Sequence, residues 1–175
     1  MEGSGYFLNT AHLYQQAALR GHLDVLQWAR AKGFDWDTSC TCNEPALYDL
    51  VTIFSWARTE GCPCDIRVCY YAARGGHLEV LKWARSHGCP WDSRVCAIAA
   101  GFGHLNLLKW VRSHGCPWGE TTCTSAASGG RLEVLQWTRA EGCPWDLNTY
   151  KATAGSGDVR RWARQNGCPR RAWGL

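Results

Sequence analysis

A segment of 17 residues recurs along this chain at a nearly fixed spacing, and this repetition constrains the fold more than any other feature. GHLEVLKWARSHGCPWD, residues 76–92, returns as GHLNLLKWVRSHGCPWG at 103–119 and as GRLEVLQWTRAEGCPWD at 130–146. Tryptophans at one place in successive copies are 27 residues apart: Trp56, Trp83, Trp110 and Trp137. Such a period is typical of solenoids, in which a unit buries its apolar face only by stacking on its neighbours.

Each unit is predicted to be a pair of helices without a strand, which gives an all-α fold. Residues 78–86 carry a broad apolar stripe, as in a helix that contacts neighbours on both sides. Gly88 and Pro90 end this helix, because glycine accepts a left-handed conformation and proline cannot continue a helix. Asp92 then stands where an N-cap is needed for a short helix over residues 94–101, whose alanine pair permits close packing.

The chain is expected to form one array of about six units over residues 1–175, with no second domain. The predicted units are 10–36, 37–64, 65–91, 92–118, 119–145 and 146–170. Unit two is irregular, because Pro45 replaces the first alanine of the pair and Asp49 replaces the corner glycine. We therefore expect the array to bend or loosen at unit two.

The net charge of +4 is mild, and it is concentrated near the C-terminus, where residues 151–175 carry six basic residues and one acidic residue. We interpret this end as the polar cap that a solenoid requires. A surface for an acidic partner is the alternative. Nucleic-acid binding is a further alternative, which would require a steep salt dependence.

The expected location is the cytoplasm, with the nucleus as the alternative. The first ten residues, MEGSGYFLNT, have neither the basic nor the apolar region of a secretory signal. No apolar run approaches the ~18 residues that a membrane span needs. We therefore expect a protein that is neither secreted nor bound to a membrane.

Nine of the eleven cysteines fall into two columns at the repeat period. One column holds Cys42, Cys69, Cys96 and Cys123, and the other holds Cys62, Cys89, Cys116, Cys143 and Cys168. Equivalent positions in stacked helices lie ~8–10 Å apart, beyond the ~7 Å limit for a disulfide. Column cysteines are therefore predicted to be free, small and buried hydrophobic residues.

Cys40 and Cys64 belong to neither column, and with two column members they form C-x-C pairs in unit two. The four residues are Cys40, Cys42, Cys62 and Cys64. Four thiolates could hold a tetrahedral zinc, although structural zinc sites usually have C-x2–4-C spacing. We predict four free thiols and no cofactor, with a zinc-binding or redox-sensitive cysteine protein as the alternative. A Cys40–Cys64 disulfide is not expected in a reducing cell.

Catalysis is not predicted, because the reactive residue types follow the repeat. Five of six histidines are column members: His22, His77 and His104, and His87 and His114. Only His12 stands alone, and the chain has no P-loop, nucleophile elbow or dinucleotide motif. Ten of the eleven tryptophans are also column members, which favours a role in the core over the stacking of nucleic-acid bases.

AIAAGFGHLNLLKWVRSHGCPWG, residues 97–119, resembles the ankyrin repeat, and the resemblance covers about residues 10–170. The unit is six residues shorter than the 33-residue ankyrin unit, and the T-P-L-H signature is absent. The missing residues fall where that family has its β-hairpin finger. This shortened form, rich in Trp and Cys, is similar to ankyrin-type arrays of giant DNA viruses of amoebae and of some protists. The expected fold is therefore an ankyrin-type helical-hairpin solenoid without fingers.

The resemblance implies a monomeric scaffold or adaptor that binds another protein, in the host-cell cytoplasm if the chain is viral. In that family the positions around the first helix line the binding face, and here the same positions vary between units. Exposed Tyr and Arg residues also tend to be hot spots of interfaces. The predicted contact residues are Ile66, Arg67, Tyr70, Tyr71, Arg74, Arg94, Phe102 and Glu120.

Overall fold

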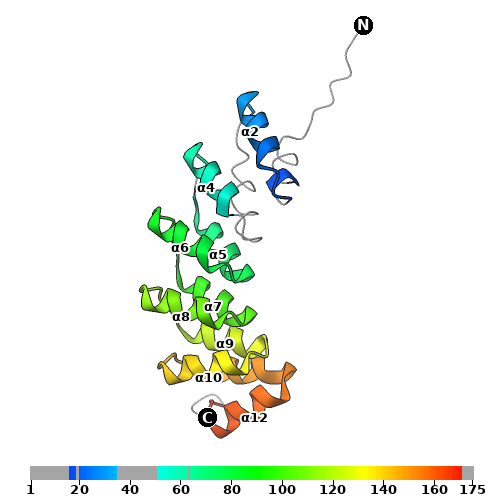
Figure 1. Ribbon diagram of the computed structural model, residues 1–175. Coiled ribbons are helices and arrows are strands. Elements are labelled where there is room, and N and C mark those ends of the chain that lie inside the picture. Colours follow the sequence, from blue (N-terminus) through cyan, green and yellow to red (C-terminus); the bar gives the residue numbers. More distant parts are fainter. Residues whose placement is uncertain (1–15, 19, 35–50, 63, 171–175) are drawn as a thin grey trace.

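The computed structural model describes residues 16–18, 20–34, 51–62 and 64–170, and within them all regular structure is helical. The helices stack in chain order into an elongated array (Figure 1). They are α2 (Leu23–Ala31), α4 (Val51–Thr59), α5 (Ile66–Gly75), α6 (Leu78–Ser86), α7 (Ser93–Phe102), α8 (Leu105–Ser113), α9 (Glu120–Ser128), α10 (Leu132–Ala140), α11 (Leu147–Ala152), the 3₁₀ turn η1 (Thr153–Gly155) and α12 (Gly157–Gln165). The predicted all-α solenoid is confirmed.

The helices form two columns, which we call the first helices (α5, α7, α9 and α11) and the second helices (α2, α4, α6, α8, α10 and α12) (Figure 1). The prediction that the first helix of a pair is short was wrong for α5, α7 and α9, which are at least as long as α6, α8 and α10. Helix α7 spans 10 residues and α8 spans 9. The reason is that α7 begins directly after its cap at Asp92 and continues through Phe102, until Gly103 adopts a left-handed conformation with φ of 87°.

The predicted aspartate caps are present at three first helices. The carboxylates of Asp65, Asp92 and Asp146 accept hydrogen bonds from backbone N–H groups in the first turns of α5, α7 and α11. At the corner after α5, Gly76 has a φ of 78°, and an added Cβ would lie 2.6 Å from Nδ1 of His104. Glycine is therefore required there both by backbone conformation and by space.

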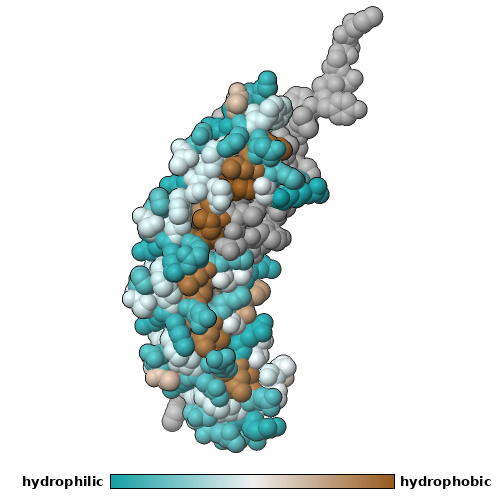
Figure 2. All heavy atoms as spheres, viewed as in Figure 1, coloured by the Kyte–Doolittle hydropathy of each residue, from teal (hydrophilic) through white to brown (hydrophobic). Residues whose placement is uncertain are grey.

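Repeat positions form one continuous core from Phe54 to Val159. In the pair α5–α6, for example, Cys69, Ala72 and Leu81 are fully buried. Figure 2 shows apolar side chains following a line down the array on the face in view. Stacking of units, rather than any single unit, therefore produces the core, as the repeat period predicts.

The G-C-P-W loops connect consecutive units by the same set of contacts. The guanidinium of Arg112 lies 4.1 Å from the ring centroid of Trp118, and Arg112 Nη1 donates a hydrogen bond of 2.6 Å to the Cys116 carbonyl. Trp118 in turn packs edge-on against Trp137 of the next unit, with ring centroids 5.7 Å apart. The loop tryptophan is therefore a bridge between units, and equivalent pairs are Trp91–Trp110 and Trp145–Trp162.

The irregularity expected at Pro45 and Asp49 lies outside the described residues, as does the lone His12. The six unit boundaries remain a prediction. No helix in the described part of the chain is both long and apolar enough to cross a membrane.

Candidate interaction surface

The eight predicted contact residues all lie on α5, α7 or α9, and none of them is fully buried. We call the exposed side of α5, α7, α9 and α11 the first-helix face. Arg67, Arg74 and Glu120 are exposed there, whereas Ile66 and Tyr71 are half-buried. Their role in binding remains a prediction, but the fold gathers them on one surface.

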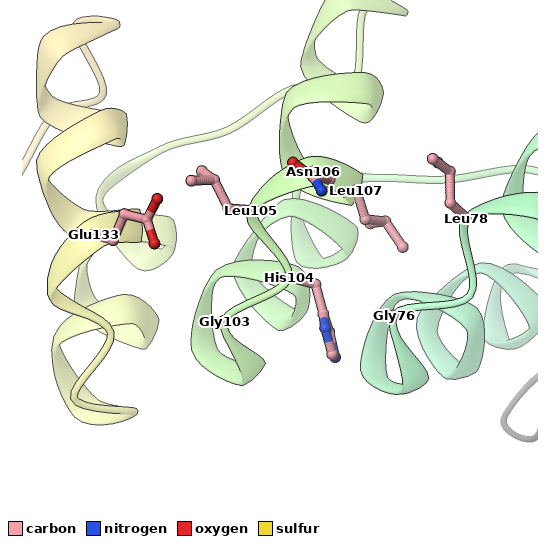
Figure 3. A pocket seen from close by; sticks show the side chains of 8 residues that line it. All are labelled: Gly76, Leu78, Gly103, His104, Leu105, Asn106, Leu107 and Glu133. Atoms are coloured by element: carbon pink, nitrogen blue, oxygen red, sulfur yellow. The ribbon is translucent and has the colours of Figure 1, made fainter.

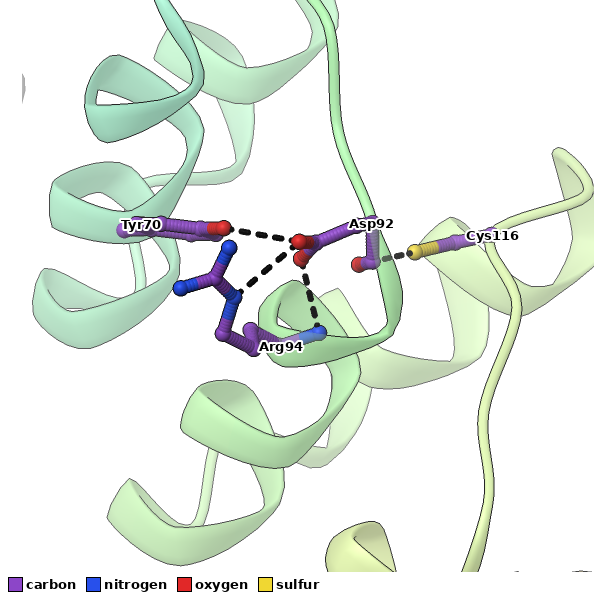
Figure 4. A network of polar contacts seen from close by, with 4 residues as sticks. All are labelled: Tyr70, Asp92, Arg94 and Cys116. Atoms are coloured by element: carbon purple, nitrogen blue, oxygen red, sulfur yellow. Dashed lines mark hydrogen bonds and ion pairs between the residues drawn. The ribbon is translucent and has the colours of Figure 1, made fainter.

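Two of the predicted residues, Tyr70 and Arg94, are brought together around Asp92 (Figure 4). The Tyr70 hydroxyl donates to Asp92 Oδ2 at 2.9 Å, and Arg94 donates to the same carboxylate through its backbone N–H and through Nε at 3.0 Å. The Arg94 guanidinium also lies 5.0 Å from the centre of the Tyr70 ring. This network joins α5 to α7, so these two side chains fix the spacing of the face as well as contributing to it.

The network changes the acidity of its members. Burial raises the pKa of the Asp92 carboxyl, but hydrogen bonds from Tyr70 and Arg94 outweigh burial and leave that pKa below its usual value. Burial and the hydrogen bond to Asp92 raise the pKa of the Tyr70 hydroxyl. Near neutral pH the network therefore holds a charged carboxylate and a neutral phenol.

Arg74 and Phe102 form a second group on the face. The Arg74 guanidinium lies 5.4 Å from the Phe102 ring centroid. Phe102 is 46% exposed, and only one other large hydrophobic residue in the described ranges, Trp28, is also classed as exposed. Because isolated large apolar side chains at a cationic rim are common anchors of interfaces, Phe102 is the strongest contact candidate.

A hollow of about 530 Å³ lies between the starts of the second helices (Figure 3). It is lined by Gly76, Leu78, Gly103, His104, Leu105, Asn106, Leu107 and Glu133. The His104 ring nitrogen Nε2 lies 3.0 Å from the Arg74 carbonyl oxygen at the end of α5. Arg131 occupies the equivalent place one unit later, and its Nε donates to the Gly101 carbonyl at 3.2 Å. This column therefore links units through the last carbonyls of the first helices.

The other histidine column caps the second helices. The rings of His87 and Trp83 stack with centroids 3.6 Å apart, and His87 Nδ1 lies 2.9 Å from the Trp83 carbonyl oxygen. Ser86 Oγ contacts the same histidine nitrogen, but it also donates to that carbonyl at 2.8 Å. The same arrangement recurs at His114, so these Ser–His pairs serve the helix ends.

Cys64 does not have the free thiol that the sequence predicts, because it is bonded to Cys89 with a Cα–Cα distance of 5.6 Å. Cys62 is also in a disulfide. Cys62, Cys64 and Cys89 were all predicted to be free thiols. That prediction was wrong for each of the three. Among the described residues no cluster of His, Cys, Asp or Glu could hold a metal ion, and Cys40 and Cys42 lie outside them.

The reason for the disulfide is the direction in which column cysteines point. Cys116 Sγ donates to the Asp92 carbonyl at 3.3 Å, and Cys143 Sγ donates to the Gly119 carbonyl at 3.3 Å. Each thiol thus faces the backbone at the point where the loop of the preceding unit joins its own unit. Cys64 occupies that preceding loop, within reach of Cys89.

The remaining described cysteines are free and buried, as predicted. They are Cys69, Cys96, Cys116, Cys123, Cys143 and Cys168. Burial raises the pKa of the Cys69 thiol to about 12 and that of Cys168 to about 11. Because the thiolate is the reactive form, both are chemically inert packing residues.

Helix α12, in the basic C-terminal unit, has one buried side and one exposed side. In α12, Val159 and Ala163 are buried against the array, whereas Arg160 and Arg164 are exposed. Arg161 forms an ion pair of 3.6 Å with Asp158 on the same helix. The interpretation of this unit as a polar cap remains a prediction.

Comparison with solved structures identifies the fold. The chain is similar to the ankyrin repeat domain of human ASB11, with a TM-score of 0.71 over 89% of this chain and 83% of that chain, at 14% sequence identity. No protein-family model matches the sequence. No curated protein matches it either. The chain therefore has the fold of an ankyrin repeat domain.

Proposed function

We propose that this chain is a non-catalytic scaffold or adaptor that binds another protein through its first-helix face. The observation that carries the proposal is where constant and varying positions lie. Cysteine and alanine positions that repeat from unit to unit are buried, as at Cys96 and Ala99. Positions that change, such as Arg74, Gly101 and Ser128, lie on the solvent side of the first helices.

The composition of the face supports a protein as the partner. Arginine and aromatic side chains are enriched at hot spots of protein interfaces. Arg74, Arg94 and Phe102 supply these types on adjoining helices. The ankyrin-type fold is also one that proteins commonly use to bind other proteins.

Paired variants test this proposal by quantitative capture from extracts of the cells that make the protein. Arg74→Glu combined with Phe102→Ser is expected to lose the captured partner. The matched pair Arg164→Glu and Trp28→Ser changes one arginine and one exposed aromatic residue off the face and is expected to keep it. Equal loss, or equal retention, in the two pairs would contradict binding at this face.

The repeat unit is shorter than the ankyrin unit and is rich in Trp and Cys. We therefore propose a giant DNA virus of amoebae or a protist as the source of the chain, and the cytoplasm as its location. The chain would act as a monomer in the cytoplasm, and its partner would be a host protein if the chain is viral. Light scattering on the purified protein at several concentrations tests the monomer. A mass that rises with concentration would contradict it.

A second function, redox sensing, is favoured by the Cys64–Cys89 disulfide. A dithiol reductant would convert this bond into two thiols while the reductant itself becomes a disulfide. Reduction of this bond would loosen the contact between units two and three. Titration of free thiols before and after denaturation, with and without reductant, tests whether this bond forms in the protein as purified.

A further inference from the structure

Side-chain size changes abruptly along the first-helix face, and this change creates a hollow. Equivalent positions carry Tyr70, Tyr71 and Arg74 on α5, then Ala97, Ile98 and Gly101 on α7, then Thr124, Ser125 and Ser128 on α9. Bulky side chains therefore cover α5, whereas at these positions α7 and α9 present smaller ones. The helices also approach closely there, because a Cβ on Gly129 would collide with the Gly101 carbonyl oxygen.

The hollow between α7 and α9 has a volume of about 410 Å³. It is lined by Arg94, Ala97, Ile98, Gly101, Phe102, Ser125, Ser128 and Gly129. Ile98 and Phe102 form its apolar wall, and glycine and serine form much of the rest. A volume of this order, with apolar walls and few polar groups, suits the burial of an apolar group.

The rim of the hollow is cationic at the corner that follows α7. Arg74 lies over the Phe102 ring, and Arg131 is held at the Gly101 carbonyl. Neither makes an ion pair within the described ranges, in contrast to Arg94, which pairs with Asp92. Glu120 is exposed at the other end of α9, so the positive charge is confined to the corner.

We infer that this hollow receives one large apolar side chain of a partner protein, from a segment in which Asp or Glu residues flank that side chain. The apolar residue would lie against Ile98 and Phe102, and a flanking carboxylate would pair with Arg74 or Arg131. This inference rests on the proposed function and adds the chemistry of the partner. A second copy of this chain fits less well, because it would bring a like-charged corner to this one.

Selection from a random peptide library displayed on phage, with the whole chain as bait, tests the inference without a known partner. Depletion on the Phe102→Ser variant removes peptides that bind elsewhere. The expected consensus is one Leu, Ile, Phe or Trp with at least two acidic neighbours. A consensus rich in Lys and Arg, or no enrichment over the Phe102→Ser bait, would overturn it.

The selected peptide is then synthesised and its affinity measured by fluorescence anisotropy. We expect binding at least about ten-fold weaker for Arg74→Glu and for Phe102→Ser, and unchanged for Arg164→Glu and Trp28→Ser. Raising salt from about 0.05 M to about 0.5 M should weaken binding several-fold, because exposed charges are screened. Affinity that does not respond to salt or to Arg74→Glu would overturn the acidic requirement.

The result also separates this inference from the proposed function. Peptides that bind the first-helix face through neutral residues would sink the inference and leave the face as the binding surface. A short single-stranded RNA that competes better than the peptide would sink both, because the partner would then not be a protein.

Discussion

Two kinds of junction hold neighbouring units together in this array. Between the later units, a loop tryptophan packs against the helix tryptophan of the next unit, as Trp118 does against Trp137. Between units two and three, Cys64 stands in place of the loop tryptophan and is bonded to Cys89. At this junction Phe54 takes the place of a core leucine, and its ring centroid lies 4.8 Å from that of Trp83.

The comparison shows that the fold needs a contact at this place but not a particular chemistry. The tryptophan bridge is an aromatic contact of modest energy that does not depend on redox conditions. The disulfide is stronger, but it exists only where thiols can be oxidised.

Cys64→Ser should cause the largest loss. The Cys64–Cys89 disulfide closes a loop with a sequence separation of 25. A disulfide that closes a loop of this size stabilises the folded protein by about 3 kcal/mol. Denaturant unfolding in oxidising buffer should show that loss, whereas with reductant the variant and the parent should have the same stability. Cys116→Ser, in the same column as Cys89 but at a free cysteine, is the control. If Cys64→Ser lost the same stability in reductant, Cys64 would stabilise the fold by packing and not through the disulfide.

Trp118→Ala should cost about 2 kcal/mol, because it removes both the edge-on contact with Trp137 and the cation–π contact with Arg112. The loss should be the same with and without reductant. Trp28→Ala, at an exposed tryptophan, should cost much less. If the two substitutions had equal effects in the same unfolding assay, the bridge would not stabilise the junction.

Phe54→Leu should cost about 1 kcal/mol in reductant, because Phe54 is fully buried and leucine leaves a gap beside Trp83. Cys64→Trp alone should also destabilise, through overpacking against the same ring. The double variant Phe54→Leu/Cys64→Trp recreates the tryptophan bridge of the later units and should recover part of the lost stability. A double-mutant cycle measures the coupling energy between positions 54 and 64. Strictly additive losses would contradict the idea that both side chains pack against Trp83.

The smallest effect concerns pH. The pKa of Asp92 is lowered in the folded chain, so its stabilising contribution is present above the unfolded value of about 3.9 and is lost as pH falls through the folded pKa. Since Asp92 is partly exposed, the contribution is under about 1 kcal/mol. Stability relative to Asp92→Asn should therefore shrink as pH falls below about 4. A difference that stays constant would exclude the carboxylate as its source.

The period, the all-helical pairing and the aspartate caps could be predicted from sequence because each depends on local residue type and spacing. Helix lengths could not, since Gly103 alone decides where α7 ends. The Cys64–Cys89 bond was missed because column spacing says nothing about which loop a thiol faces. The replacement of the loop tryptophan by Cys64 was the available signal.

For the first-helix face, alignment of the units was enough to find exposed varying residues. It could not show that Tyr70 is tied to Asp92, because that bond spans two units. Nor could it show the hollow between α7 and α9, which depends on how closely Gly101 approaches Gly129. The small residue Ser125, which follows Tyr71 and Ile98 in the same column, was a usable signal.

The most direct test of binding at this face is site-specific photocrosslinking in the cells that make the protein. A benzophenone amino acid is placed at Ser128 on the first-helix face, and separately at Ser113 at the end of the second helix α8; both positions are exposed. We predict a covalent adduct with a single partner protein from Ser128 and none from Ser113. An adduct from Ser113 alone, or equal adducts from both, would contradict this account.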